Sequence, residues 1–191
     1  MTWDIKAGLM GKRVHFSSTL PTASLTRPSN PVERDAASHL LSFFPEIPLT
    51  IDDYLVQRTA LQDVLWPTVQ LLPGVHKLIA HLHAHDIPIA VATASQRRNL
   101  LLKTEHLQHV FGLFGDRVVC ADDVRGKTNG KPEPYIFLCA ARERLGRGVG
   151  EGEGEGEGVM QAERMERAKG LVFEDAVLGV EAGKRAGMAG E

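Results

Sequence analysis

The feature that most constrains the fold is an uninterrupted apolar run at residues 87–93, with the sequence Ile-Pro-Ile-Ala-Val-Ala-Thr. A run of this kind, without polar alternation, is typical of a parallel strand that is covered on both faces. Before it, apolar residues recur over residues 75–82 at the spacing of one helix face. We therefore expect an α/β chain with right-handed crossovers, in which residues 87–93 form a strand inside a sheet.

The same alternation continues toward the end of the chain. Further strands are expected at residues 117–121 and 170–173, and helices over 96–107, from Pro134 onward, over 160–168 and over 177–187. The pattern stops at Ala189-Gly-Glu191, where an α/β fold normally enters another strand. We therefore expect the last strand of the sheet to be missing.

The first third of the chain has a different character. Its helical patterns, over residues 3–12, 33–44 and 52–66, are interrupted by a stretch rich in Ser, Thr and Pro. That stretch, residues 13–31, lacks apolar periodicity, which is typical of a disordered insert. We therefore predict a helical cap over residues 1–70 and an α/β core over residues 71–191.

Local signals mark the ends of one helix and a linker. Thr50 lies three residues before Asp53, a spacing that favours a cap at a helix N-terminus, and Pro67 disfavours continuation of the helix. Residues 146–158 are dominated by Gly and Glu. Because such a segment cannot bury apolar surface, we predict a flexible surface linker there.

Composition narrows the classes of partner. The chain has 22 Lys and Arg against 24 Asp and Glu, a formal net charge of −2. This balance argues against a basic surface for nucleic acid and a basic tail for membranes. Cys120 and Cys139 form no CxxC motif, so we expect buried reduced thiols of a cytoplasmic protein. No apolar run is long enough to predict a membrane span or a signal peptide.

Two carboxylates, Glu174 and Asp175, directly follow the strand expected at residues 170–173. Ligands bind at the carboxyl ends of strands in open parallel sheets, and two adjacent hard oxygen donors suit Mg²⁺. Glycines then recur at positions 179, 183 and 187, which predicts a bare stripe where a helix approaches the sheet closely. The alternative is that Asp175 only caps the next helix and Glu174 is a solvated strand end.

Two further positions have the chemistry to bind phosphate. Lys131, in Gly130-Lys-Pro-Glu-Pro134, lies at the start of an expected helix and can neutralise a phosphate as a compact charge. Thr93 ends the first strand and begins the turn Thr93-Ala94-Ser95, whose hydroxyls and backbone N–H groups can bind phosphate oxygens. Ser95 and Asn99 are further candidates near this turn. The alternatives are an exposed loop lysine and a threonine that only caps a helix.

Together, segments 87–95, 129–137 and 170–188 resemble motifs two, three and four of the haloacid dehalogenase-like phosphatases, and more narrowly the pseudouridine-5′-phosphatase-like members with a small helical cap. The resemblance covers roughly residues 1–12 and 33–188. It implies a Rossmann-like parallel sheet and Mg²⁺-dependent hydrolysis of a small phosphorylated metabolite, such as a nucleoside or sugar phosphate. It also implies roles for the matching residues: Thr93, Ala94 and Ser95 bind phosphate, Lys131 steadies the nucleophile and the phosphoryl group, Glu174 and Asp175 hold Mg²⁺, and Lys12 faces the substrate.

One motif of that family is absent from these 191 residues. Its members begin with a strand ending in Asp-x-Asp, whose first Asp attacks phosphorus and whose second serves as general acid and base. Without it, we expect the first strand to be missing, unpaired edges beside the strands that end at Thr93 and Glu174, and an inactive chain. A non-catalytic phosphate-binding module and an unstable fragment of a longer enzyme stay open as alternatives, and a sugar-phosphate mutase is the neighbouring enzyme class.

Overall fold

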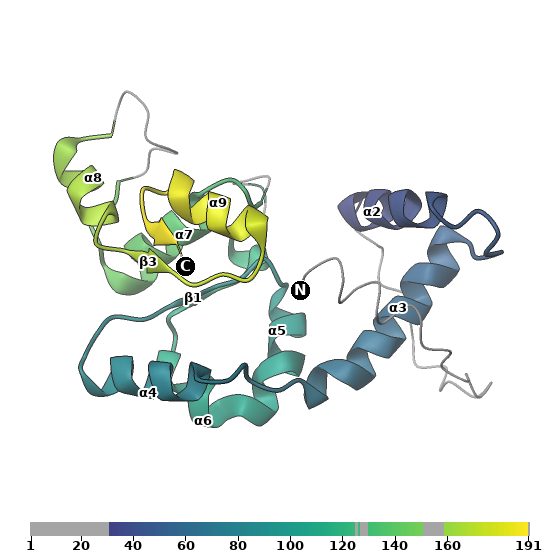
Figure 1. Ribbon diagram of the computed structural model, residues 1–191, viewed down its shortest axis with the longest axis horizontal. Helices are drawn as coiled ribbons and strands as arrows, with labels where there is room; N and C mark the ends of the chain where they lie inside the picture. Colours follow the sequence, from purple (N-terminus) through teal and green to yellow (C-terminus); the bar gives the residue numbers. More distant parts are fainter. Residues whose placement is uncertain (1–30, 125, 127–129, 151–158, 191) are drawn as a thin grey trace. The chain divides into compact units, whose positions relative to one another are not determined.

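The computed structural model describes residues 31–124, 126, 130–150 and 159–190 (Figure 1). These residues belong to two compact units that divide between Val69 and Gln70, and each unit is described by itself. The helix expected over residues 3–12, with Lys12, and residues 13–30 of the expected insert lie outside the described residues.

The first unit consists of helices. Helix α2 (Pro31–Ser42) and helix α3 (Ile51–Leu65) pack together, and a 3₁₀ turn, η1 (Trp66–Thr68), follows α3. The α-helix ends at Leu65, one residue before Trp66-Pro67, close to the predicted stop. The buried residues Ala37 and Leu55 come from the two helices.

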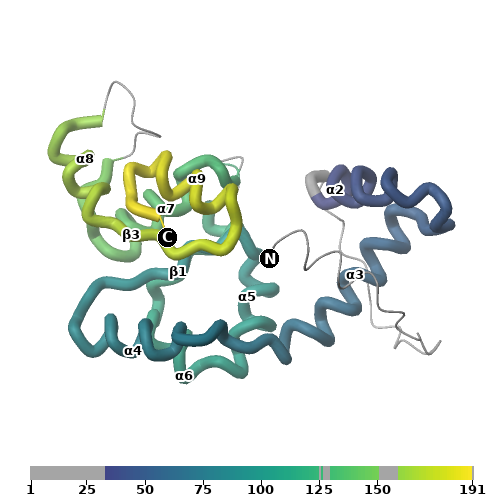
Figure 2. Tube along the Cα trace, viewed as in Figure 1, coloured from purple at the N-terminus to yellow at the C-terminus, as the bar shows by residue number. Residues whose placement is uncertain are grey.

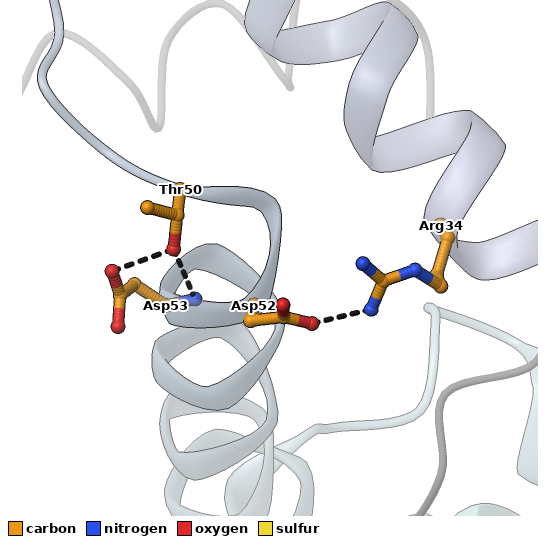
Figure 3. A network of polar contacts seen from close by, with 4 residues as sticks. All are labelled: Arg34, Thr50, Asp52 and Asp53. Atoms are coloured by element: carbon orange, nitrogen blue, oxygen red, sulfur yellow. Dashed lines mark hydrogen bonds and ion pairs between the residues drawn. The ribbon is translucent and has the colours of Figure 1, made fainter.

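A polar network fixes the start of α3 (Figure 3). The Asp53 N–H donates to Thr50 Oγ1 at 3.1 Å, and the Thr50 hydroxyl donates to Asp53 Oδ2 at 2.6 Å. The cap predicted at Thr50 is therefore confirmed. The guanidinium of Arg34, in α2, pairs with Asp52 in the first turn of α3. At this end of the helix the negative charge of Asp52 also interacts favourably with the helix dipole.

We expect Thr50→Ala to lower the free energy of unfolding by about 1 kcal/mol, because the Asp53 N–H loses its acceptor. Thr50→Ser is the matched control, since it keeps the capping oxygen. Urea unfolding followed by circular dichroism measures both. Equal stabilities for the Ala and Ser variants would contradict a capping role.

The second unit alternates helices and strands, as the sequence predicts. Its elements are, in chain order, α4 (Val75–Ala84), β1 (Val91–Ala92), α5 (Arg97–Thr104), η2 (Glu105–Leu107), α6 (Gln108–Phe111), η3 (Gly112–Phe114), β2 (Val118–Val119), η4 (Ala121–Val124), α7 (Tyr135–Cys139), the π-helical turn η5 (Ala140–Arg144), α8 (Gln161–Arg167), β3 (Leu171–Val172), α9 (Val177–Arg185) and β4 (Ala189–Gly190). The three expected strand segments each contain a strand. The paired regions are shorter than expected, with two residues in each ladder.

The strands pair in parallel, which confirms the α/β class. Val91 and Ala92 of β1 lie opposite Val118 and Val119 of β2, and β3 pairs with β4 in the same sense. Among the described residues the strands form two separate two-stranded sheets rather than one, and β1 and β3 each have one strand partner.

The end of the chain differs from the expectation that the last strand is missing. Ala189 and Gly190 form β4, and the Ala189 N–H donates to the carbonyl of Gly170 at 3.0 Å. Gly187 makes this possible, because its φ of 74° lies in the left-handed region and turns the chain out of α9 toward β3.

One hydrophobic cluster joins several elements of this unit. It includes Val119 from β2, Val172 from β3 and Ala182 from α9, together with most of α7, and Ala92 of β1 packs against it. Helix α9 contacts both β3 and α7, and the three elements can be followed in the ribbon and in the tube (Figures 1 and 2). Cys120 and Cys139 are both buried, as predicted, and no disulfide joins them.

The described part of the Gly- and Glu-rich segment, residues 146–150, contacts the rest of the unit. Val149 is 1% exposed, and its carbonyl accepts a hydrogen bond from Arg167 Nε at 2.7 Å. The Gly150 carbonyl accepts from Arg142 Nη1 at 3.2 Å. Residues 146–150 are therefore held by α8 and η5, while 151–158 lie outside the described residues.

Candidate functional site

An ion pair joins two of the residues singled out in the sequence. Lys131 Nζ pairs with Glu174 Oε2 across 43 residues of chain, and the two side chains are 13% and 14% exposed. Lys131 precedes α7 and Glu174 follows β3, so both residues are placed by elements of the same hydrophobic cluster. The structure thus brings the predicted phosphate lysine and one predicted metal ligand into direct contact.

The aromatic ring of Phe137, in α7, also positions Lys131. The ammonium nitrogen lies 4.7 Å from the ring centroid, within the range of a cation–π interaction. Because Phe137 is buried in the core cluster, its ring is a fixed surface for the lysine. Sequence reasoning did not find this contact.

Two glycines of the predicted stripe have different structural reasons. A Cβ at Gly183 would lie 3.1 Å from Val172 Cβ, so this glycine allows α9 to approach β3, as expected. A Cβ at Gly179 would overlap the carboxylate end of Glu174. Gly179 therefore leaves the space that Glu174 occupies beside Lys131, a role that the sequence spacing did not indicate.

The turn after β1 is fastened to β2 and the segment that follows it. The Thr93 N–H donates to the Val119 carbonyl at 2.9 Å, and the Ala121 N–H donates to the Ser95 carbonyl at 3.1 Å. Within the turn, the Ser95 N–H donates to Thr93 Oγ1 at 3.1 Å. Thr93 and Ser95 are half-buried and Ala94 is exposed.

Two aspartates after β2 hold the start of α5, and sequence reasoning missed both. Asp122 Oδ2 accepts from the Arg97 N–H at 2.6 Å. Asp123 Oδ2 accepts from the Cys120 N–H at 2.8 Å and from Arg97 Nη2 at 2.6 Å. The signal that could have identified them is an acidic pair directly after a strand, the pattern already noted for Glu174 and Asp175.

The environment of Asp123 favours its charged form. Burial by itself raises the pKa of this carboxyl, but the Cys120 N–H and the Arg97 guanidinium outweigh burial, and the pKa lies below its ordinary value. Burial also raises the pKa of the Cys120 thiol, and there the effect of burial exceeds the opposing effect of the Arg97 charge, so the pKa of the thiol lies above its ordinary value.

Comparison with known proteins identifies the family. A family model described as haloacid dehalogenase-like hydrolase matches residues 35–187. The chain belongs to the haloacid dehalogenase-like hydrolases. The resemblance inferred from the three sequence motifs is therefore confirmed.

Three relatives of this haloacid dehalogenase-like chain are described as phosphatases. It is 35% identical to (DL)-glycerol-3-phosphatase 2 of Arabidopsis thaliana, over 97% of this chain and 62% of the relative. It is 36% identical to a probable pseudouridine-5′-phosphatase of Drosophila melanogaster, over 75% of this chain and 54% of the relative. It is 33% identical to the bifunctional riboflavin kinase/FMN phosphatase of Arabidopsis thaliana, over 74% of this chain and 31% of the relative.

The chain covers less than two thirds of the length of each of these haloacid dehalogenase-like relatives. Within the described ranges, no helix has both the length and the hydropathy that a membrane crossing needs.

The predicted site residues of this haloacid dehalogenase-like chain fall into two groups. Lys131 and Glu174 are paired, with the exposed Asp175 next in sequence. Thr93 and Ser95 share a turn, and Asn99 lies in the first turn of α5. Val172, two residues before Glu174, is in the core cluster, and Ala92, directly before Thr93, packs against that cluster. The assignment of the site residues to phosphate and metal stays a prediction.

We expect Asp123→Ala to lower the free energy of unfolding by about 1–3 kcal/mol at neutral pH, because the buried Cys120 N–H and the Arg97 guanidinium lose a shared acceptor. The measurement is urea unfolding across a pH series. Asp123→Asn is the matched control, since it keeps an acceptor for the Cys120 N–H and does not titrate.

The sign of the pH dependence follows from the lowered pKa. The folded-state pKa of Asp123 lies below the ordinary 3.8, so the unfolded chain binds more protons in mild acid. The stabilisation that Asp123 contributes to the folded state is complete above the ordinary pKa and is lost as the pH falls through the folded-state pKa. The titratable groups near Asp123 are Arg97, Arg144 and Cys120. The unchanged chain should lose more stability than Asp123→Asn between about pH 5 and pH 3, and identical losses would contradict this assignment.

Proposed function

We propose that this chain binds the phosphate group of a small phosphomonoester at the carboxyl ends of β1 and β3, in the Mg²⁺-dependent chemistry of the haloacid dehalogenase-like phosphatases. The observation that carries the proposal is the shielded Lys131–Glu174 pair, held above the bare position of Gly179. Such a pair is costly to desolvate, and an incoming phosphate with a cation would satisfy both of its charges.

Each group in the proposal has a defined task. Lys131 offers an ammonium that neutralises phosphate oxygens in the ground state and in the transition state. The hydroxyls of Thr93 and Ser95 and the N–H group of Ala94 donate to the remaining oxygens. Lys12 stays a candidate for contacting the rest of the substrate, and we propose that the helical unit is the cap.

Glu174 and Asp175 fit Mg²⁺ as the two protein ligands. Mg²⁺ is usually held by one or two carboxylates, with waters and substrate phosphate completing the octahedron. Among the described residues, no three His, Cys, Asp or Glu side chains gather in a metal-binding arrangement. When bound, Mg²⁺ would polarise the phosphoryl group and offset its charge.

We propose that these 191 residues by themselves bind phosphate and do not hydrolyse its esters. Phosphatases of this kind form a covalent aspartyl-phosphate, and the sequence contains no Asp-x-Asp motif to supply that nucleophile. Loss of the nucleophile from a covalent mechanism costs on the order of 10⁴–10⁶ in rate. Hydrolysis by a longer protein that includes these residues is compatible with the same site.

The substrate class follows from chemistry and from relatives. The named relatives act on glycerol 3-phosphate, pseudouridine 5′-phosphate or FMN, all of which are small and phosphorylated. We propose a small phosphorylated metabolite as partner, in line with the near-neutral charge of the chain. A cytoplasmic location stays a prediction, and one relative is described as mitochondrial.

We expect the 191-residue chain to bind inorganic phosphate in the presence of Mg²⁺, and Lys131→Ala to weaken this binding by about tenfold to 100-fold, because a charge-assisted hydrogen bond is lost. Isothermal titration calorimetry measures the affinity. Lys169→Ala is the matched control, because Lys169 lies before the amino end of β3 and pairs with Glu166.

The same samples are then assayed on p-nitrophenyl phosphate with Mg²⁺. Turnover that requires Lys131 would contradict the proposed inactivity of the isolated chain. Phosphate binding that is the same in the Lys131 and Lys169 variants would contradict the proposed site.

We expect Gly179→Ala to separate folding from binding. The new Cβ would displace the flexible carboxylate end of Glu174, and Mg²⁺ affinity should fall by about tenfold. The free energy of unfolding should change little, because the preference of about 1 kcal/mol for Ala over Gly in a helix interior offsets the weakened pair between Glu174 and Lys131.

Gly183→Ala is the matched control, because its Cβ would meet Val172 in the core and not Glu174. Its effect should appear in the unfolding free energy and not in a calorimetric Mg²⁺ titration. A Gly179→Ala chain with unchanged Mg²⁺ affinity would rule out this role for the glycine.

A further inference from the structure

A second lysine lies at the turn after β1 and has no role in the site described so far. Lys103 is in the last turn of α5, eight residues after Ser95, and its Nζ donates to Ser95 Oγ at 3.2 Å. The side chain is half-buried, and burial lowers the pKa of its ammonium group. α5 therefore places a cation directly against a hydroxyl of the proposed phosphate turn.

The direction of this hydrogen bond follows from the chemistry of the two groups. A lysine ammonium has three donors and no acceptor, so Ser95 Oγ must accept. The hydroxyl proton of Ser95 then has to point away from Lys103. Among the described residues, Ser95 Oγ donates no hydrogen bond, so the proton is available to a ligand.

The orientation of the Thr93 hydroxyl is restricted by a hydrogen bond in a similar way. Thr93 Oγ1 accepts the Ser95 N–H at 3.1 Å, which occupies one of its lone pairs and leaves its own proton to be donated. The turn is also fixed at both backbone ends, through the Thr93 N–H to Val119 and the Ser95 carbonyl to Ala121. Two oriented O–H donors beside a half-buried cation are suited to an oxyanion.

We propose that Lys103 is a positioning residue of the phosphate site: by donating to Ser95 Oγ it directs the Ser95 hydroxyl proton, alongside that of Thr93, toward a bound phosphate oxygen. This inference rests on the proposed function, because it assigns Thr93 and Ser95 to phosphate. Lys103 acts through Ser95 and does not itself touch the ligand.

A double-mutant cycle on the full 191-residue chain tests the proposal, with inorganic phosphate as the probe and calorimetry as the measurement. Lys103→Met keeps the length of the side chain and removes its donors. It should weaken phosphate binding by about three- to tenfold, as should Ser95→Ala. In the Ser95→Ala background, Lys103→Met should weaken binding by less than about twofold, because the hydroxyl it orients is already gone.

Two controls separate positioning from charge and from folding. Lys103→Arg keeps donor and charge and should bind phosphate within about twofold of the unchanged chain. Lys169→Met removes the same charge at the other end of β3 and should leave binding unchanged. Thermal unfolding of every variant identifies a Lys103→Met chain that fails to fold. In that case two measurements provide the test: the loss of phosphate affinity in Ser95→Ala, and the NMR shift of the Ser95 amide in the unchanged chain during phosphate titration.

The outcomes separate this inference from the proposed function. Equal weakening by Lys103→Met with and without Ser95 would overturn the positioning role, since it would indicate a general charge effect. An unperturbed Ser95 amide during phosphate titration would overturn it as well. Failure of the unchanged chain to bind phosphate, or binding that is insensitive to Lys131→Ala, would overturn the site itself and the inference with it.

Discussion

The ion pair between Lys131 and Glu174 connects two segments that are distant in the sequence and meet only because α7, β3 and α9 share a core. Both groups are largely removed from water, so their attraction has to offset a desolvation cost, and the loss of either partner leaves an uncompensated charge. The ring of Phe137 fixes the position of the Lys131 ammonium group, and the absence of a Cβ at Gly179 leaves room for the Glu174 carboxylate. The pair is therefore a property of the packed unit and not of either loop alone.

A second set of polar contacts gives the turn after β1 its shape. Asp122 and Asp123 follow β2, while Arg97 begins α5, so their contacts join the segments that follow two neighbouring parallel strands. A turn that is tied to both strands loses little further conformational freedom when a ligand binds. The ends of β1 and β2 thus form one preorganised surface, with the hydroxyls of Thr93 and Ser95 on it.

Apolar periodicity predicted most of the order of the helices and strands. A helix that buries one face shows apolar residues at helical spacing, and a strand that is buried on both faces shows a continuous apolar run. The cap at Thr50 and the position of Glu174 after a strand were equally predictable, since both depend on local chemistry.

Contacts that depend on three-dimensional packing were not predictable. The approach of Lys103 to Ser95 needs the path of a turn and of a whole helix, and the space at Gly179 is visible only once Glu174 is placed. The strand β4 was missed because two small residues at a chain end show no apolar pattern, although Gly187 turns the backbone toward β3.

Gly179 has a consequence for efforts to engineer this fold. At a buried position inside α9, nearly every criterion of protein stabilisation favours alanine over glycine. A consensus or computational design that scores thermal tolerance alone would select that exchange and would gain a firmer helix. It would do so at a position where the missing methyl group leaves room for the Glu174 side chain. Selection for thermal stability would therefore act against ligand recognition at this residue.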